Sequence, residues 1–332
     1  ALLPSLRRED LEPRHKPIPL ETEFLRRNSV SIPILYHDLF TNGIVYLDLG
    51  LDLSALPADL LPFAPLFGQA LLEMGTEAED FVRLSHRIGR TTGGIRATTL
   101  VAPKRDTRYE IRDTSSERSE LPSRISNLVS HLVLRGKATT AQAPAMLDIL
   151  RDVLTTVRLD NQERFRQMVL EAKAGAEAQL SPAGHVLADT RLRAHLHPAF
   201  AVEEALNGVS QLLFLRRLAD DVERDWPGVL ARLEQVRAAL VARAGVIANV
   251  TVDGANYRAF EPRLEAFLAE LPADAQGSRG AGVQGSQEDA LSPAPLLPCS
   301  PAPPPPPPPA GGFFPSAVKY GAQGAHPHRP GH

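Results

Sequence analysis

The sequence is poor in cysteine and in aromatic residues. Its 332 residues include one cysteine, Cys299, and aromatic residues make up 5% of the chain. One cysteine cannot form an internal disulfide, so the chain fits a reducing compartment such as cytosol, mitochondrial matrix or plastid stroma. With so few aromatic side chains, we expect the core to consist mainly of Leu, Val, Ile and Ala.

Long apolar runs and a strong charge imbalance are also missing. No stretch of about 18 apolar residues occurs, so we expect no membrane span. The formal net charge is −3, which indicates neither a nucleic-acid partner nor a polybasic membrane tether. The chain begins with Ala1, and its first residues do not form a signal peptide. We therefore expect the natural N-terminus to be absent, together with any targeting segment.

Motifs for hydrolase and phosphate chemistry are not found. No G-x-S-x-G string is present, so a serine hydrolase lacks support. The run Arg90-Thr91-Thr92-Gly93-Gly94 lacks the spacing of a phosphate-binding loop and precedes an expected strand rather than a helix. We interpret this run as a turn.

Two clusters of potential metal ligands favour structural roles. His195 and His197 form a close pair before Pro198, without an acidic or cysteine neighbour in the sequence. We interpret the pair as helix-capping or surface residues. The second cluster consists of three aspartates, Asp220, Asp221 and Asp225, and it alternates with arginines at 216, 217 and 224. This pattern is more typical of a solvated helix face with ion pairs than of a magnesium site.

Hydrophobic periodicity predicts an α+β fold with helices packed on a mainly antiparallel sheet. Between Ile44 and Leu53 every odd position is apolar from Val45 onward, which is typical of a strand with one buried face. We expect strands at 32–37, 44–53, 95–101, 131–135 and 245–252, with 109–112 as a continuation of the sheet. We expect helices at 57–74 (regular from about Pro65), 79–88, 141–157, 160–180, 227–242 and 260–271, and a mostly helical region at 187–218.

Changes in composition predict the domain limits. Residues 1–30 are interrupted by prolines and indicate a linker, whereas 31–272 form the α+β domain. Within it, the Ser/Arg/Glu-rich stretch 113–127 indicates an exposed insertion. Residues 273–332 include seven consecutive prolines, Pro303 to Pro309, and indicate a disordered tail. A spacer or a translated intron is favoured there over a ligand for a proline-recognising domain.

Several segments resemble the presequence protease family, a branch of the pitrilysin/insulysin class of zinc metalloendopeptidases. These segments are HDLFTNGI at 37–44, LPFAPLFGQALLEMGT at 61–76, RIGRTTGGI at 87–95, LRGK at 134–137, DNQERF at 160–165 and DWP at 225–227. They occur in the family's order, and the resemblance covers about residues 5–272, with breaks at 113–127 and again after Pro272.

The resemblance implies a place in a larger enzyme. The family has four homologous α+β domains in two halves, which are joined by a helical linker and close around a peptide. By resemblance, residues 1–30 are the end of that linker. Residues 31–272 are the third, non-catalytic domain, with a fold like the metallohydrolase domain of pitrilysin and mitochondrial processing peptidases.

The resemblance also implies that this chain has no zinc site. The family's first domain binds zinc through His-x-x-Glu-His and a downstream Glu, a string that this sequence does not contain. The equivalent positions by internal duplication are Leu66, Gln69 and Ala70, which can neither bind zinc nor activate water. We therefore expect no catalytic or metal-binding residue here, and zinc only in the complete enzyme. The family's substrate-contacting Arg and Tyr belong to the fourth domain, which would begin after Pro272, and the substrate-binding residues of this chain stay unknown.

The leading functional hypothesis is a partial metalloendopeptidase for short unstructured and targeting peptides, inactive alone, whose chain forms part of the chamber wall. Its expected partners are peptide substrates and the missing N-terminal catalytic half, in cis or in trans, and its expected compartment is the mitochondrial matrix or plastid stroma. An alternative is a non-catalytic interaction subunit that docks on a separately encoded zinc-bearing half. An unrelated hydrolase is a third, weaker option.

Overall fold

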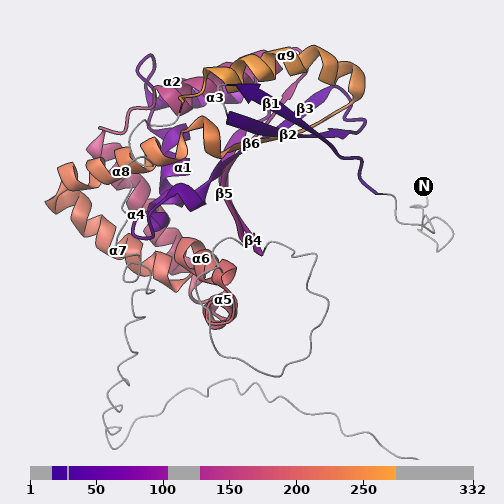
Figure 1. Ribbon diagram of the computed structural model, residues 1–332. Helices are drawn as coiled ribbons and strands as arrows, with labels where there is room; N and C mark the ends of the chain where they lie inside the picture. The colour runs from indigo at the N-terminus through magenta and orange to yellow at the C-terminus, as the bar shows by residue number, and fades with distance from the viewer. Residues whose placement is uncertain (1–16, 28–29, 104–127, 274–332) are drawn as a thin grey trace, which may run out of the picture. The chain divides into compact units, whose positions relative to one another are not determined.

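A single six-stranded sheet organises the computed structural model, which describes residues 17–27, 30–103 and 128–273. Its order is β1-β2-β6-β3-β5-β4, so β1 and β4 lie at the two edges (Figure 1). The pair β2–β6 is parallel, and the other neighbours are antiparallel. The strands are β1 Glu21–Arg27, β2 Val30–Asp38, β3 Ile44–Asp52, β4 Ile95–Pro103, β5 Leu128–Thr139 and β6 Val246–Val252.

Side-chain alternation along the central strands places the core on one face of the sheet. In β3 the odd-numbered residues from Val45 to Leu51 are fully buried, whereas Tyr46 is exposed on the other face. The neighbouring strand β6 repeats the pattern, with Val246, Ala248 and the two following even-numbered valines buried. Period-two alternation therefore sets which face receives the helices.

The helices cover this apolar face and share one core with it. Buried side chains from α1, α3, α4, α7, α8 and α9 belong to the same cluster as those of β3 and β6. The α+β fold with a mixed, mostly antiparallel sheet is therefore confirmed. In order, the helices are α1 Ala64–Glu73, α2 Phe81–Thr91, α3 Ala143–Thr155, α4 Gln162–Gln179, α5 Gly184–Arg193, α6 Pro198–Asn207, α7 Val209–Arg224, α8 Trp226–Leu240 and α9 Gly254–Glu270.

The sheet begins earlier than the sequence predicted. A linker was expected up to residue 30, but Glu21–Arg27 forms edge strand β1, antiparallel to β2. Side chains hold it in place: the Tyr257 hydroxyl of α9 donates to Glu23 Oε2 over 2.7 Å. The prediction was wrong for this segment because a mostly exposed, charged edge strand lacks the apolar period of a central strand. The remaining linker prediction falls largely on residues 1–16, outside the described part.

Most predicted elements occur, with shifts at their ends. Pro62 lies in a short 3-10 turn before α1, and Pro65 lies in the first turn of α1, so the regular helix begins near Pro65 as predicted. Helix α9 starts at Gly254 rather than Phe260, because Asp253 caps it and Pro262 is accommodated inside it. Strand β5 is longer than predicted. The predicted strand at 109–112 and insertion at 113–127 lie outside the described residues, as does the predicted tail from 274 onward.

None of the helices in the described part of the chain is both long and apolar enough to cross a membrane.

Candidate functional site

Helix α1 carries the three positions that the resemblance equates with the zinc motif. Leu66 and Ala70 are 2% and 0% exposed, since both pack into the core. Gln69 is half-buried, and its Nε2 donates to Glu73 Oε1 over 3.0 Å. Two of the three positions therefore point away from solvent and have no donor atom for a metal. The residues at this helix do not fit a zinc ion.

The same conclusion extends to the rest of the described chain. Across residues 17–27, 30–103 and 128–273, no group of three or more His, Cys, Asp or Glu side chains is placed to hold a metal ion.

The polar groups on the outer side of α1 are held by α4. Arg164 Nη2 donates to Glu73 Oε2 over 2.6 Å, and Arg164 Nε donates to the Glu73 carbonyl over 3.2 Å. The guanidinium carbon also lies 5.0 Å from the centre of the Phe81 ring, at the start of α2. Arg164 thus neutralises Glu73 and joins three helices.

A surface pocket of about 650 Å³ lies between α1, α2 and the first residues of β4. Gly68 lets α1 approach the sheet there, because a Cβ at this position would lie 2.8 Å from Ala97 Cβ and 2.7 Å from Leu132 Cδ1. The lining mixes apolar and polar side chains. It consists of Pro65, Gln69, Leu72, Glu73, Phe81, Val82, Ser85, His86, Ile88, Ile95, Arg96, Ala97 and Arg164.

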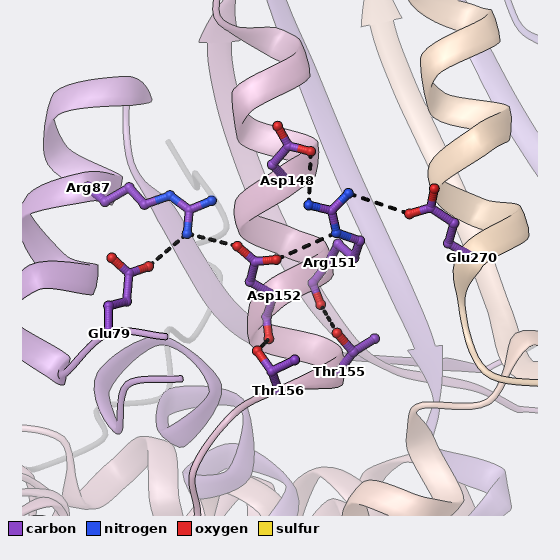
Figure 2. Close-up of polar contacts among 8 residues, drawn as sticks. All are labelled: Glu79, Arg87, Asp148, Arg151, Asp152, Thr155, Thr156 and Glu270. Carbon is purple, nitrogen blue, oxygen red and sulfur yellow. Dashed lines mark hydrogen bonds and ion pairs between the residues drawn. The ribbon is translucent and has the colours of Figure 1, made fainter. Parts of the chain in front are cut away.

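An ion-pair network positions α2, the outer wall of this pocket. Arg87 Nη1 donates to Glu79 Oε1 over 2.7 Å and to Asp152 Oδ2 of α3 over 2.8 Å (Figure 2). Arg151 extends the network, with ion-pair distances of 3.5 Å to both Asp152 and Glu270 of α9. Since Leu84 is the one residue of α2 that is fully buried, these charges contribute much of its attachment.

The run Arg90–Gly94 forms the end of α2 and the turn into β4. Thr92 Oγ1 accepts from the Gly94 amide over 3.0 Å, and the Gly93 amide donates to the Lys137 carbonyl over 2.7 Å. Gly94 has φ +104°, a backbone conformation that favours glycine. The turn interpretation is therefore confirmed.

The histidine pair lies at the start of α6. His197 Nδ1 accepts from the Ala199 amide over 3.1 Å, so it caps this helix. His195 lies in the preceding turn, outside the helices. The capping interpretation is thus confirmed for His197.

The three aspartates do not form one site. Asp225 caps α8 by accepting from the Gly228 amide over 3.1 Å. Asp220 is exposed and Asp221 half-buried on α7. The ion pair of Arg216 goes to Glu177 of α4, over 2.9 Å, rather than along α7. The expected intrahelical pairing is therefore replaced by a contact between two helices.

Comparison with known proteins decides the family. Residues 1–218 match the family model of the associated domain found in M16 peptidases of subfamily C. The chain belongs to this M16-associated family. The match confirms the resemblance seen in the sequence, and the relatives of this M16-associated chain include presequence proteases.

Two curated relatives show the extent of the similarity. Presequence protease 1, chloroplastic/mitochondrial, of Arabidopsis thaliana is 35% identical over 275 residues, 83% of this chain and 23% of that protein. The mitochondrial presequence protease of Danio rerio is 25% identical over 235 residues, 71% of this chain and 21% of that protein. The M16-associated chain therefore spans less than a quarter of the length of these relatives.

One solved structure that aligns with this chain is the peptidase M16 inactive domain from Pseudomonas fluorescens. It aligns over 79% of this chain and 54% of its own, with a TM-score of 0.47 and 16% sequence identity. The six-stranded sheet and its helices described above define the fold of the M16-associated chain.

Sequence reasoning missed the residues that shape the pocket of this M16-associated domain. Glu73 and Arg164 are 91 positions apart, and Arg87 and Asp152 are 65 apart. No local spacing marks such pairs, because helix packing alone brings them together. One local feature pointed to a long-range ion pair. Helix α2 contains no acidic residue, so Arg87 has no partner on its own helix.

Proposed function

We propose that this chain is a non-catalytic, peptide-enclosing domain of a presequence-protease-like zinc metalloendopeptidase. The proposal rests on which side chains helix α1 carries, and how they are packed, in a chain that belongs to the M16-associated family. At the positions equivalent to the zinc motif, Leu66 and Ala70 are packed into the core and Gln69 is bonded to Glu73. The domain thus acts on peptides by shape and surface, while the zinc belongs to another part of the enzyme.

The proposed substrates are short unstructured peptides, including removed targeting sequences. The support comes from the names of the relatives and from the family, since the matched part covers 23% of the Arabidopsis protein. A catalytic half with zinc would then act together with this chain, in cis or in trans. The proposed compartment is the mitochondrial matrix or plastid stroma, in keeping with the single cysteine.

Reconstitution tests this proposal. The purified chain is mixed with a separately produced zinc-bearing N-terminal half of a presequence protease, and association is followed by size-exclusion chromatography. We expect a stable complex. A control half with its zinc-binding histidines replaced should also associate, because the contact does not require the metal.

Cleavage of a fluorogenic unstructured peptide by the mixture distinguishes a subunit that acts in trans from a piece of a longer enzyme. A gain in cleavage on mixing supports a subunit that acts in trans, whereas association without cleavage supports a piece that needs further domains. Absence of any association at micromolar concentration would contradict the proposed partnership.

A further inference from the structure

Five carboxylates surround the end of the sheet at which β1 begins, β2 and β6 end, and α9 starts (Figure 1). They are grouped around two stacked tyrosines, Tyr36 of β2 and Tyr257 of α9, whose ring centres lie 3.8 Å apart. The five are Glu21, Glu23, Asp38, Asp253 and Glu261. Within the described part of the chain, none of them forms an ion pair. We call this group the acidic patch.

The titration of groups in the acidic patch reflects its uncompensated negative charge. Burial raises the pKa of Tyr36 to about 12, and the charges of three of the carboxylates add to this rise. Burial likewise raises the pKa of Glu261, and the charges of Glu23 and Glu265 add to it. In neither case does a cation of the described chain offset the rise. An incoming cation would therefore be attracted to this end of the sheet.

A buried hydroxyl marks a position for that cation within the acidic patch. Tyr36 is 4% exposed, and its hydroxyl has no hydrogen-bond partner among the described residues. It faces Gly254, where a Cβ would lie 3.6 Å from the Tyr36 hydroxyl and 3.3 Å from Asp38 Oδ2. The other carboxylate oxygen, Asp38 Oδ1, accepts from the Gly254 amide over 2.9 Å. A guanidinium or ammonium group beside Gly254 would thus meet two oxygen acceptors, one of them charged.

Exposed apolar side chains border the acidic patch. Ile18 and Leu20 are 66% and 55% exposed, and Phe40 is 86% exposed. His37 Nδ1 donates to the Pro19 carbonyl over 2.7 Å, which holds the first two beside the end of β2. Phe40 follows that end directly. Apolar side chains next to unpaired carboxylates fit a partner that carries apolar and basic side chains close together.

We propose that the acidic patch binds a basic amphipathic helix of a separate polypeptide. Basic side chains of that helix face the five carboxylates, and one of them reaches the position beside Gly254. Its apolar side chains cover Ile18, Leu20 and Phe40. The carboxylates select positive charge, and the apolar border selects an amphipathic helix over a uniformly charged chain. This contact requires neither zinc nor a catalytic half, so it stands independently of the function proposed above.

Fluorescence anisotropy with the full chain and labelled peptides tests the proposal. The probe is a helical peptide of about 18 residues, with Arg on one face and Leu on the other. One matched probe has the same composition in an order that gives no apolar face, and a second carries Glu for every Arg. We expect saturable binding of the basic amphipathic probe. The reordered probe should bind at least about fivefold more weakly, and the acidic probe should not bind.

Variants locate the binding surface. The double variant Glu21→Gln/Glu261→Gln should weaken binding of the basic amphipathic probe by about threefold to tenfold. The matched control Glu163→Gln/Glu171→Gln removes the same charge from α4, outside the acidic patch, and should leave the affinity unchanged. Tyr36→Phe removes the buried hydroxyl and should weaken binding by about threefold. Circular dichroism checks that each variant is folded, which we expect because none of these side-chain groups accepts or donates a hydrogen bond that joins two elements of the described chain.

Each of four outcomes would overturn the proposal. The first is no saturable binding of the basic amphipathic probe, and the second is equal binding of the reordered probe, which would show that the surface attracts positive charge in any arrangement. The third is an unchanged affinity of Glu21→Gln/Glu261→Gln or of Tyr36→Phe. The fourth is an equal loss of affinity in the α4 control, which would place the contact elsewhere or assign it to net charge alone.

Discussion

At the scale of single residues, two glycines allow close packing on the two faces of the sheet. Gly68 allows α1 to contact β4 and β5, and Gly50 allows Ile247 and His131 to close over β3 on the opposite face. A Cβ at Gly50 would lie 2.7 Å from Ile247 Cγ2. Such contacts are shorter than real Cβ atoms tolerate, so packing rather than backbone conformation explains both glycines.

Gly68→Ala should destabilise the fold even though alanine favours helices. The helix gain is about 0.5–1 kcal/mol, whereas overpacking against Ala97 and Leu132 costs about 1–3 kcal/mol. Gly175→Ala is the matched control, because a Cβ there meets nothing within 4 Å. We expect urea unfolding to show lower stability for Gly68→Ala and higher stability for Gly175→Ala. The same sign for both would contradict this packing account.

His131 should make stability depend on mildly acidic pH. Burial lowers the pKa of His131, although the charge of Asp52 opposes this. The unfolded chain therefore binds more protons, and stability should fall as pH drops through the ordinary histidine pKa of about 6.5. We expect the melting temperature to fall between about pH 7.5 and 5.5, and to fall less in His131→Gln. A variant that loses as much as the wild type would show that other groups govern this range.

At the scale of elements, α2 is attached by partly buried charges as well as by apolar burial of Leu84 and Ile88. Arg87, Glu79 and Asp152 have side-chain exposures of 28%, 15% and 27%, so their ion pairs are partly shielded from water. Together with Arg151 they link α2 to α3 and α9 (Figure 2). A partly buried charge that loses its partner destabilises the fold. Movement of α2 away from α3 would break these pairs, so the network helps to fix the position of the helix.

The substitution Arg87→Met tests how much these ion pairs contribute to stability. Two carboxylates would lose their cation, so we expect a loss of about 1–3 kcal/mol in the free energy of unfolding. Arg166→Gln is the control, because its pair with Glu223 is 37% and 58% exposed and should contribute less than about 1 kcal/mol. Chemical denaturation measures both. Equal effects would indicate that the Arg87 network is no stronger than a surface pair.

The sequence predicted the elements better than their long-range contacts. Period two in Val45–Leu51 and the proline-to-glycine limits around α1 identify those elements directly, because each is a local property. Strand β1 was missed, since an edge strand with exposed Phe24 has no apolar face to count. The pocket was also missed, because Arg164 and Glu73 meet only through the packing of α4 on α1.

At the scale of the whole chain, the described domain is a sheet with a helical layer on one face and a pocket at its β4 edge. Helix α1, which the resemblance equates with the family's zinc helix, has a packing role here, with Ala70 fully buried. The chain spans 23% of the Arabidopsis relative, and the function that we propose makes it a part of a larger enzyme. Its proposed contribution to peptide handling is thus a surface rather than a reaction.

The most direct test is cleavage of an unstructured fluorogenic peptide by the purified full chain alone, with zinc added and with a parallel sample containing a zinc chelator. A complete presequence protease serves as the positive control. We predict no cleavage above background in either sample, because α1 presents Leu66, Gln69 and Ala70 where metal ligands and a base would be required. Zinc-dependent turnover that the chelator abolishes would contradict the account.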